Sequence, residues 1–254
     1  MTKIVIPIKS DVIDNNTADF YDFFGMTNYV SPKKVGDQLA KVQTGDTVEL
    51  QIASNGGDVF AASEIYTQLK SSTAKVSAVI QGLAASAASV IAVAADDVKI
   101  SPTAQIMIHK AWSTMQGNAE DLAHESQVLN GIDQSIANAY EAKTGMSSGD
   151  LLNLMSKETW LGANDAVKYG FADSIMTFSD EKEPEKQQQA MQAFASTSTV
   201  VPKAAVAKWQ GIMAKMQAYK ILDKVKDIPT ITQKSDSQQA DLKNQKLAIL
   251  FGKK

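Results

Sequence analysis

The fold of this chain is predicted most directly by residues 75–95, which have the sequence KVSAVIQGLAASAASVIAVAA. Lys75–Ile80 has the β-branched, alternating character of a strand, and the small residues of Ala84–Ala95 are typical of a tightly packed helix. From residue 76 to residue 95 there is no charge, and a transmembrane helix needs ~20 such residues. The stretch is dominated by Ala and Ser rather than by Leu, Ile and Phe, which indicates a buried strand and helix of a soluble protein.

The segments on both sides of this stretch repeat the alternation of strand and helix. Strands are predicted at Ile4–Ile8, Thr47–Ala53, Val98–Ile100 and Gln105–Ile108, and helices within Asp11–Tyr29 and Ser31–Val42 and at Val59–Lys70, Asn118–Thr144 and Asn164–Tyr169. Pro32 is favourable in a first helical turn, and Gly145 predicts a left-handed cap after the longest helix. Such alternation predicts an α/β fold with a mainly parallel sheet and helices packed on it.

The composition changes after about residue 178. Residues 1–178 form the predicted main domain, and the charged, Gln-rich sequence SDEKEPEKQQQ at 179–189 begins a predicted linker over 179–200. Residues 201–254 are predicted to be a helical, flexible extension. Its helix should cover about Lys203–Lys226, before Pro229, and a last apolar patch lies at Leu247–Phe251.

Charge and composition exclude several classes of function. The 254 residues carry a net charge of −3, which gives no basic surface for nucleic acid. There is no cysteine, so disulfides, thiolate metal sites and a cysteine nucleophile are excluded. The two histidines lack the spacing of metal ligands. The apolar run within Met1–Lys9 is too short for a signal peptide. We therefore expect a soluble, cytoplasmic protein with no cofactor, no metal and no membrane or nucleic-acid partner.

Ser86 and His109 are the residues most suited to nucleophilic chemistry. Ser86 lies at a strand-to-helix turn, where free N–H groups can stabilise an oxyanion, although small residues at such a turn are also typical of close packing alone. A serine nucleophile needs a base, and His109 ends the apolar run 106–108 at a predicted strand end. His124 lies in a polar helical stretch and is predicted to be a surface residue.

Two further segments have both a functional and a structural interpretation. The sequence SNGG at 54–57 can direct backbone amides toward a ligand or can form a plain turn, and it matches neither a P-loop nor a dinucleotide fingerprint. Glu158 is a candidate for orienting His109, and a solvated surface glutamate is the alternative.

Taken together, these segments resemble the Clp protease proteolytic subunit family of serine peptidases. The resembling blocks are IASNGG at 52–57, GLAASAA at 82–88, IMIH at 106–109 and ANDAVKYGFAD at 163–173, and they occur in the family's order. The resemblance implies Ser86 as nucleophile, His109 as base and the amides of Gly57 and Ala87 as oxyanion hole. It aligns Glu158 with the family's aspartate, and Ser89, one turn beyond Ser86, is a rival nucleophile that the block alignment disfavours.

The resemblance also implies an architecture and partners. The family has a crotonase-like spiral of β-β-α units with a protruding handle helix, here 118–144, and seven-subunit rings that stack into a closed chamber for peptide substrates. The sequences FGMTNYVSP at 24–32 and ETW at 158–160 resemble phage and prophage members, which are associated with capsid (prohead) maturation and hence with capsid or scaffold proteins. The N-terminus is too unlike the family's docking loop to transfer an ATP-driven unfoldase, so this partner stays open.

Two other functions fit the same fold. A crotonase-type enzyme would bind an acyl-CoA thioester and use paired backbone amides without a serine nucleophile. A non-catalytic assembly protein would keep the fold for ring formation, and the glutamate at position 158 and the long tail leave room for it.

Overall fold

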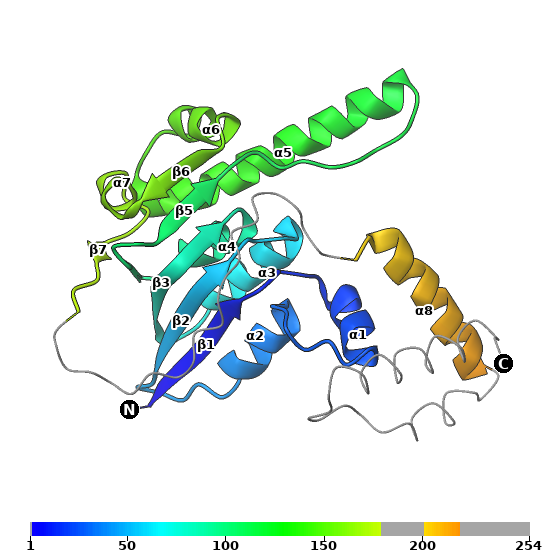
Figure 1. Cartoon of the computed structure of the whole chain (residues 1–254), viewed down its shortest axis with the longest axis horizontal. Helices are drawn as coiled ribbons and strands as arrows, with labels where there is room; N and C mark the ends of the chain where they lie inside the picture. The colour runs from blue at the N-terminus through cyan, green and yellow to red at the C-terminus, as the bar shows by residue number, and fades with distance from the viewer. Residues whose placement is uncertain (1, 179–200, 219–254) are drawn as a thin grey trace.

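The computed structural model describes residues 2–178 and 201–218, and a twisted sheet lies at its centre (Figure 1). The strands are β1 (Lys3–Lys9), β2 (Thr47–Ser54), β3 (Lys75–Ala85), β4 (Asp97–Ile100), β5 (Gln105–Ile108), β6 (Thr159–Gly162) and β7 (Ser174–Ile175). They form a 7-stranded sheet in the order β1-β2-β3-β4-β7, with β5 paired to β3 and β6 paired to β5. Only the β5–β6 pair among the described strands is antiparallel. The predicted α/β class and mainly parallel sheet are therefore confirmed.

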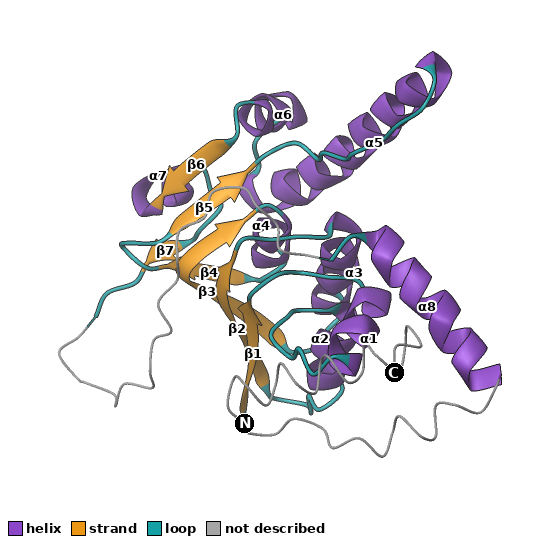
Figure 2. Cartoon of the chain, turned by 45° about the vertical axis from the view of Figure 1, so that its right-hand side comes forward, coloured by secondary structure: helices purple, strands orange, loops and turns teal. Residues whose placement is uncertain are grey.

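The helices cover the sheet and extend beyond it. They are α1 (Asn15–Phe23), α2 (Pro32–Leu39), α3 (Val59–Lys70), α4 (Ala87–Ala92), α5 (Ala119–Thr144), α6 (Ser148–Ser156), α7 (Ala163–Lys168) and α8 (Lys203–Ala218). Helices α2, α3 and α4 lie on one side of the sheet (Figure 2), and their apolar residues join the strands in one core. The short elements α6, β6 and β7 were not predicted, because runs of two to nine residues show too little periodicity.

The long helix α5 has the limits that its capping residues predict. Asn118 and Asp121 form a capping box at its start, and Gly145 ends it with φ 71°. The first half of the helix is largely exposed and projects from the body of the protein, whereas its second half contains the buried residues (Figure 1). The predicted protruding helix is therefore present.

The prediction for residues 81–86 is wrong in one respect. We predicted a strand ending at Ile80 and a helix from Ala84, but β3 continues to Ala85. The extension exists because residues 83–85 of β3 pair with β5, beyond Ile80, which is the last residue of β3 that pairs with β4. The helix that follows, α4, is therefore shorter than predicted, and all six of its residues are buried. No helix in the described part of the chain is long and apolar enough to cross a bilayer.

Helix α8 lies beside α1 at one end of the molecule (Figure 1). The Trp209 ring lies 5.5 Å from the ring of Phe20 and 5.7 Å from that of Phe23. The Lys203 ammonium contacts the carboxylates of Asp58 at 2.5 Å and Asp14 at 3.9 Å. The helix predicted at 203–226 is confirmed over 203–218. Its remainder, the linker at 179–200 and the patch at 247–251 lie outside the described residues, and the domain limits stay a prediction.

Candidate active site

Ser86 lies in the turn between β3 and α4, and its backbone is strained. Its φ of 53° and ψ of −124° belong to a region that residues other than glycine rarely adopt. The Ser86 N–H donates to the carbonyl of Met107 at 2.8 Å, and the Ser86 carbonyl accepts from the N–H of Ser89 at 2.9 Å. Strained conformations persist where the surroundings fix them, and they are concentrated at functional sites. The position of the Ser86 side chain is therefore set by the backbone around it.

His109 follows β5 directly and faces Ser86. The parallel pairing of β3 with β5 matches Ala85 with Met107, so the two strands end side by side. This register places Nε2 of His109 2.7 Å from Oγ of Ser86, within hydrogen-bonding distance. The two residues come from different strands and are 23 positions apart in the chain.

The surroundings of His109 keep its imidazole neutral near pH 7. Burial lowers the pKa of His109, and the negative charges of Glu158 and Asp133 only partly offset this effect. A neutral imidazole with its proton on Nδ1 has a free lone pair on Nε2. It can therefore accept the proton of the Ser86 hydroxyl, which a protonated imidazole could not.

The glycine loop after β2 lies against the Ser86 turn. A Cβ on Gly56 would be 2.5 Å from the carbonyl oxygen of Ala85 and 2.9 Å from Cβ of Ser86, so only glycine allows this approach. Gly57 has φ 145°, and a Cβ there would overlap the carbonyl oxygen of Val12. The turn is held by its neighbours, because Val12 N–H donates to the Gly56 carbonyl and Asp58 N–H donates to the Val12 carbonyl.

The amides of Gly57 and Ala87 are the predicted oxyanion donors. Within residues 2–178 and 201–218, neither N–H donates to a protein acceptor. Unpaired N–H groups of this kind can hold the negative charge that develops on a carbonyl oxygen during acyl transfer. The loop and the turn that carry them meet at Ser86. The role of these two amides as an oxyanion hole stays a prediction.

Glu158 lies beside His109 but does not bond to it. The antiparallel pairing of β5 with β6 matches Ile108 with Thr159, so the next pair in the register would be His109 and Glu158. Glu158 is exposed, has φ 49°, and accepts a hydrogen bond from Trp160 Nε1 at 3.3 Å. Among the described residues no carboxylate accepts from Nδ1 of His109. The assignment of Glu158 as third member of a triad stays a prediction.

The other candidate residues from the sequence have different surroundings. Ser89 is fully buried, and its hydroxyl lies 2.5 Å from the Ser86 carbonyl and 2.8 Å from the Tyr140 hydroxyl, so it is closed to a substrate. His124 is exposed on α5, as predicted. In the described part of the chain, no three His, Asp or Glu side chains gather as metal ligands would.

One buried carboxylate near the site was missed by sequence analysis. Asp133 lies on the buried face of α5 and bonds to the backbone just after His109. An aspartate among the apolar positions of a helix was the signal that could have identified it, because a buried carboxylate needs a partner.

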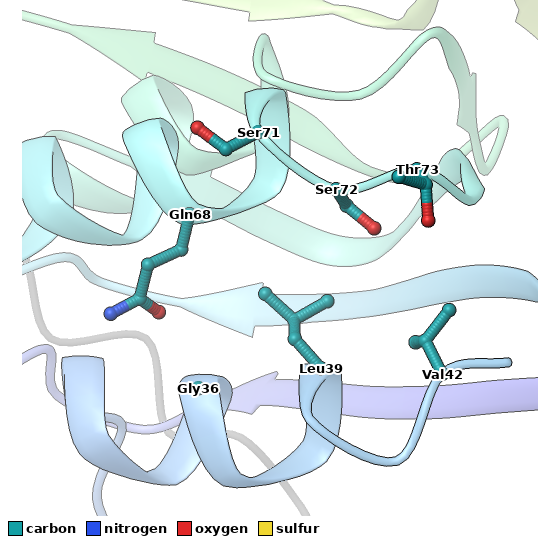
Figure 3. Close-up of a pocket in the computed structure, with 7 residues that line it drawn as sticks. All are labelled: Gly36, Leu39, Val42, Gln68, Ser71, Ser72 and Thr73. Atoms are coloured by element: carbon teal, nitrogen blue, oxygen red, sulfur yellow. The ribbon is translucent and has the colours of Figure 1, made fainter.

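A surface pocket of about 420 Å³ lies away from these residues, between the end of α2 and the end of α3 (Figure 3). Its lining does not include Ser86, His109 or Glu158. The lining residues are Gly36, Leu39, Val42, Gln68, Ser71, Ser72 and Thr73. They offer hydroxyl and amide groups but no charged group, and we assign no chemistry to this pocket.

The chain is similar to several known proteins. The model of the family described as Clp protease matches residues 32–179. The ATP-dependent Clp protease proteolytic subunit 1 of Chlamydia muridarum is 29% identical over 181 residues, which are 67% of this chain and 94% of the relative. The ATP-dependent Clp protease proteolytic subunit of Bacteroides fragilis is 28% identical over 140 residues, which are 54% of this chain and 68% of the relative.

Proposed function

Because this chain belongs to the Clp protease family, we propose that it is a serine endopeptidase with Ser86 as nucleophile and His109 as general base. The observation that supports this function most strongly is the 2.7 Å separation of His109 Nε2 from Ser86 Oγ. The neutral state of His109, which follows from the lowering of its pKa by burial, also favours it. Nucleophile and base within hydrogen-bonding distance are typical of covalent catalysis.

The reaction would proceed in two stages. His109 takes the proton of the Ser86 hydroxyl as Oγ forms a bond to the peptide carbonyl carbon. The N–H groups of Gly57 and Ala87 hold the oxyanion of the tetrahedral intermediate. His109 then gives its proton to the leaving amine, and the C–N bond breaks to leave an acyl ester on Ser86. In the second stage His109 takes a proton from water as the water oxygen bonds to the ester carbon, and it returns the proton to Ser86 Oγ as the ester bond breaks.

The family membership further supports an oligomeric enzyme that acts on protein substrates. We expect rings of this chain, with the active sites facing an enclosed chamber. Native mass measurement tests the assembly. A ring of seven or a double ring of fourteen would follow the family resemblance, and a monomer at micromolar concentration would contradict it.

A serine-directed probe tests the nucleophile. A fluorophosphonate should label the protein once per chain, and mass mapping should place the adduct on Ser86. Ser86→Ala should abolish labelling and lower peptide cleavage by roughly 10⁴-fold or more. Ser63→Ala, which alters an exposed serine on α3, is the matched control and should label normally. Normal peptide turnover by the Ser86→Ala protein would overturn the proposal.

The phage-like segments at 24–32 and 158–160 support a narrower proposal, which is that the substrate is a capsid or scaffold protein. The test is to incubate the enzyme with purified scaffold and coat precursors, with denatured casein as a general substrate. Cleavage of a head-protein precursor at a few discrete sites by the wild type, absent from Ser86→Ala, is the expected result. Equal, unselective cleavage of casein and head proteins would contradict the narrower proposal and leave the peptidase intact.

The two other functions have distinct outcomes in the same assays. A crotonase-type enzyme would bind coenzyme A and turn over thioesters without reacting with the probe. A non-catalytic assembly protein would form rings, cleave no peptide and leave the probe unreacted. The hydrogen-bonded Ser86 and His109 favour the peptidase over both, because neither alternative requires this pair.

A further inference from the structure

The buried face of α5 contacts both segments that hold the proposed catalytic pair. The buried residues of this helix are Asp133, Ile136, Ala137 and Tyr140, whose spacings of three, four and seven place them on one face. Two of the four are polar. Each of these two residues forms a hydrogen bond with a segment next to Ser86 or His109. The polar groups of this face therefore contact the site and not the solvent.

Asp133 fixes the backbone that follows His109. Its side chain is only 5% exposed, and its Oδ1 accepts a hydrogen bond from the N–H of Ala111 at 2.8 Å. Its Oδ2 lies 3.7 Å from the ammonium of Lys110. Lys110 and Ala111 are the two residues after His109, and the N–H of Lys110 donates to the carbonyl of Met155 at 3.2 Å. The backbone after His109 is therefore fixed by α5 on one side and α6 on the other.

Tyr140 holds the Ser86 side of the site from the same helix. Its hydroxyl lies 2.8 Å from the hydroxyl of Ser89, which in turn donates to the Ser86 carbonyl at 2.5 Å. Both Tyr140 and Ser89 are fully enclosed in the core. Two turns of one helix thus reach the backbones on both sides of the Ser86–His109 hydrogen bond.

We propose that Asp133 is a positioning residue for His109, fixing its backbone through Ala111 and placing a buried negative charge near its imidazole. This inference rests on the proposed role of His109 as general base. The charged groups around the imidazole are Glu158 before β6, Asp133 on α5 and Lys110, which follows His109 in the chain. Glu158 raises the pKa of His109 more than Asp133 does, but Glu158 is exposed and Lys110 is partly exposed, so salt screens both more than it screens Asp133.

The buried charge has a direct chemical use. When His109 takes the proton of Ser86, the imidazole becomes positive, and a nearby carboxylate stabilises that state. The interaction is stronger in a region of low dielectric constant than in water. Removal of the charge at position 133 should therefore disfavour protonated His109, whereas the hydrogen bond to Ala111 can be kept by an asparagine oxygen.

The titration of the two histidines tests the inference directly. With only two histidines in the chain, ¹³C-labelled imidazole signals can be followed by NMR and assigned with His124→Gln. Asp133→Asn should lower the pKa of His109 and leave that of His124 unchanged, and the shift should persist at 0.5 M salt. Asp37→Asn, an exposed aspartate on α2, is the control and should shift neither. An unchanged His109 titration in Asp133→Asn would overturn the inference.

Activity assays separate charge from hydrogen bonding. Asp133→Asn should lower kcat about tenfold with little change in KM and move the acid limb of the pH profile to lower pH. Asp133→Ala, which also loses the bond to Ala111, should lower kcat by a further factor of about ten with the same shift of the limb. A loss through misfolding alone would lower activity without moving the limb. Should the wild type fail to label at Ser86, the proposed function fails, while the imidazole titration still decides the role of Asp133.

Discussion

Ser86 and Glu158 both lie next to His109, and both have a backbone conformation unusual for their residue types. They are two of the three non-glycine residues with positive φ in the described part of the chain, at 53° and 49°. Around Ser86, the strand, the glycine loop and α4 are closely packed and hydrogen-bonded. Glu158 is exposed, and its carboxylate bonds to a tryptophan two residues away.

The difference shows which parts of the site need fixed geometry. A reacting oxygen must be held to a fraction of an ångström, and a strained turn is stable there because many contacts define it. A carboxylate that acts through its charge tolerates a looser position, since Coulomb interactions change slowly with distance. Small structural changes around Ser86 should therefore lower the activity strongly, whereas similar changes around Glu158 should lower it little.

Gly57→Ala is expected to cause the largest loss of activity among the changes near Ser86. A Cβ at this position would overlap the Val12 carbonyl oxygen, so the loop must move and its N–H with it. We expect kcat/KM to fall by about 10²–10³-fold, the loss typical of one oxyanion donor. Peptide assays and thermal melting measure the change. Gly131→Ala on α5, where a Cβ meets no atom within 4 Å, is the control and should retain activity. Full activity of Gly57→Ala would mean that this N–H has no part in the reaction.

A gentler change on the same side is Tyr140→Phe. It removes one buried hydroxyl that bonds to Ser89 and leaves the ring in place. We expect kcat to fall by about three- to tenfold, as for one lost hydrogen bond, with no shift of the acid limb because no charge changes. A double-mutant cycle with Ser89→Ala should show strong non-additivity. Additive losses would show that the two hydroxyls do not act through one another.

The smallest effect is expected on the Glu158 side. Glu158→Gln removes a negative charge that raises the pKa of His109, so the pKa falls and the acid limb of the pH–rate profile moves to lower pH. The plateau rate should fall only about two- to threefold, since exposed charges contribute little, and the difference should shrink in 0.5 M salt. A loss of 10³-fold or more would instead indicate a direct Glu158–His109 bond in the working enzyme.

The sequence predicted those features that rest on local patterns. Val59–Lys70, Gln105–Ile108 and the cap at Gly145 agree with the structure, because strand alternation, helix periodicity and caps are local. The extension of β3 to Ala85 was missed, because small residues there fit a helix equally well until β5 is placed beside them. Asp133 was missed because the sequence does not show that its partner is the backbone N–H of Ala111, 22 residues away.

The contact of Lys203 with Asp58 has a consequence that follows from mass action. Residues 179–200 connect helix α8 to residues 1–178 of the same chain. The partner of Lys203, Asp58, immediately follows Gly57. In the intact chain α8 belongs to the same molecule as Asp58, so their contact is intramolecular and does not depend on the protein concentration. After a single cut in that segment, the same helix would be a separate molecule whose occupancy depends on its dilution. A cut and diluted protein would therefore lose the ammonium beside Asp58, while an intact protein at any concentration would keep it.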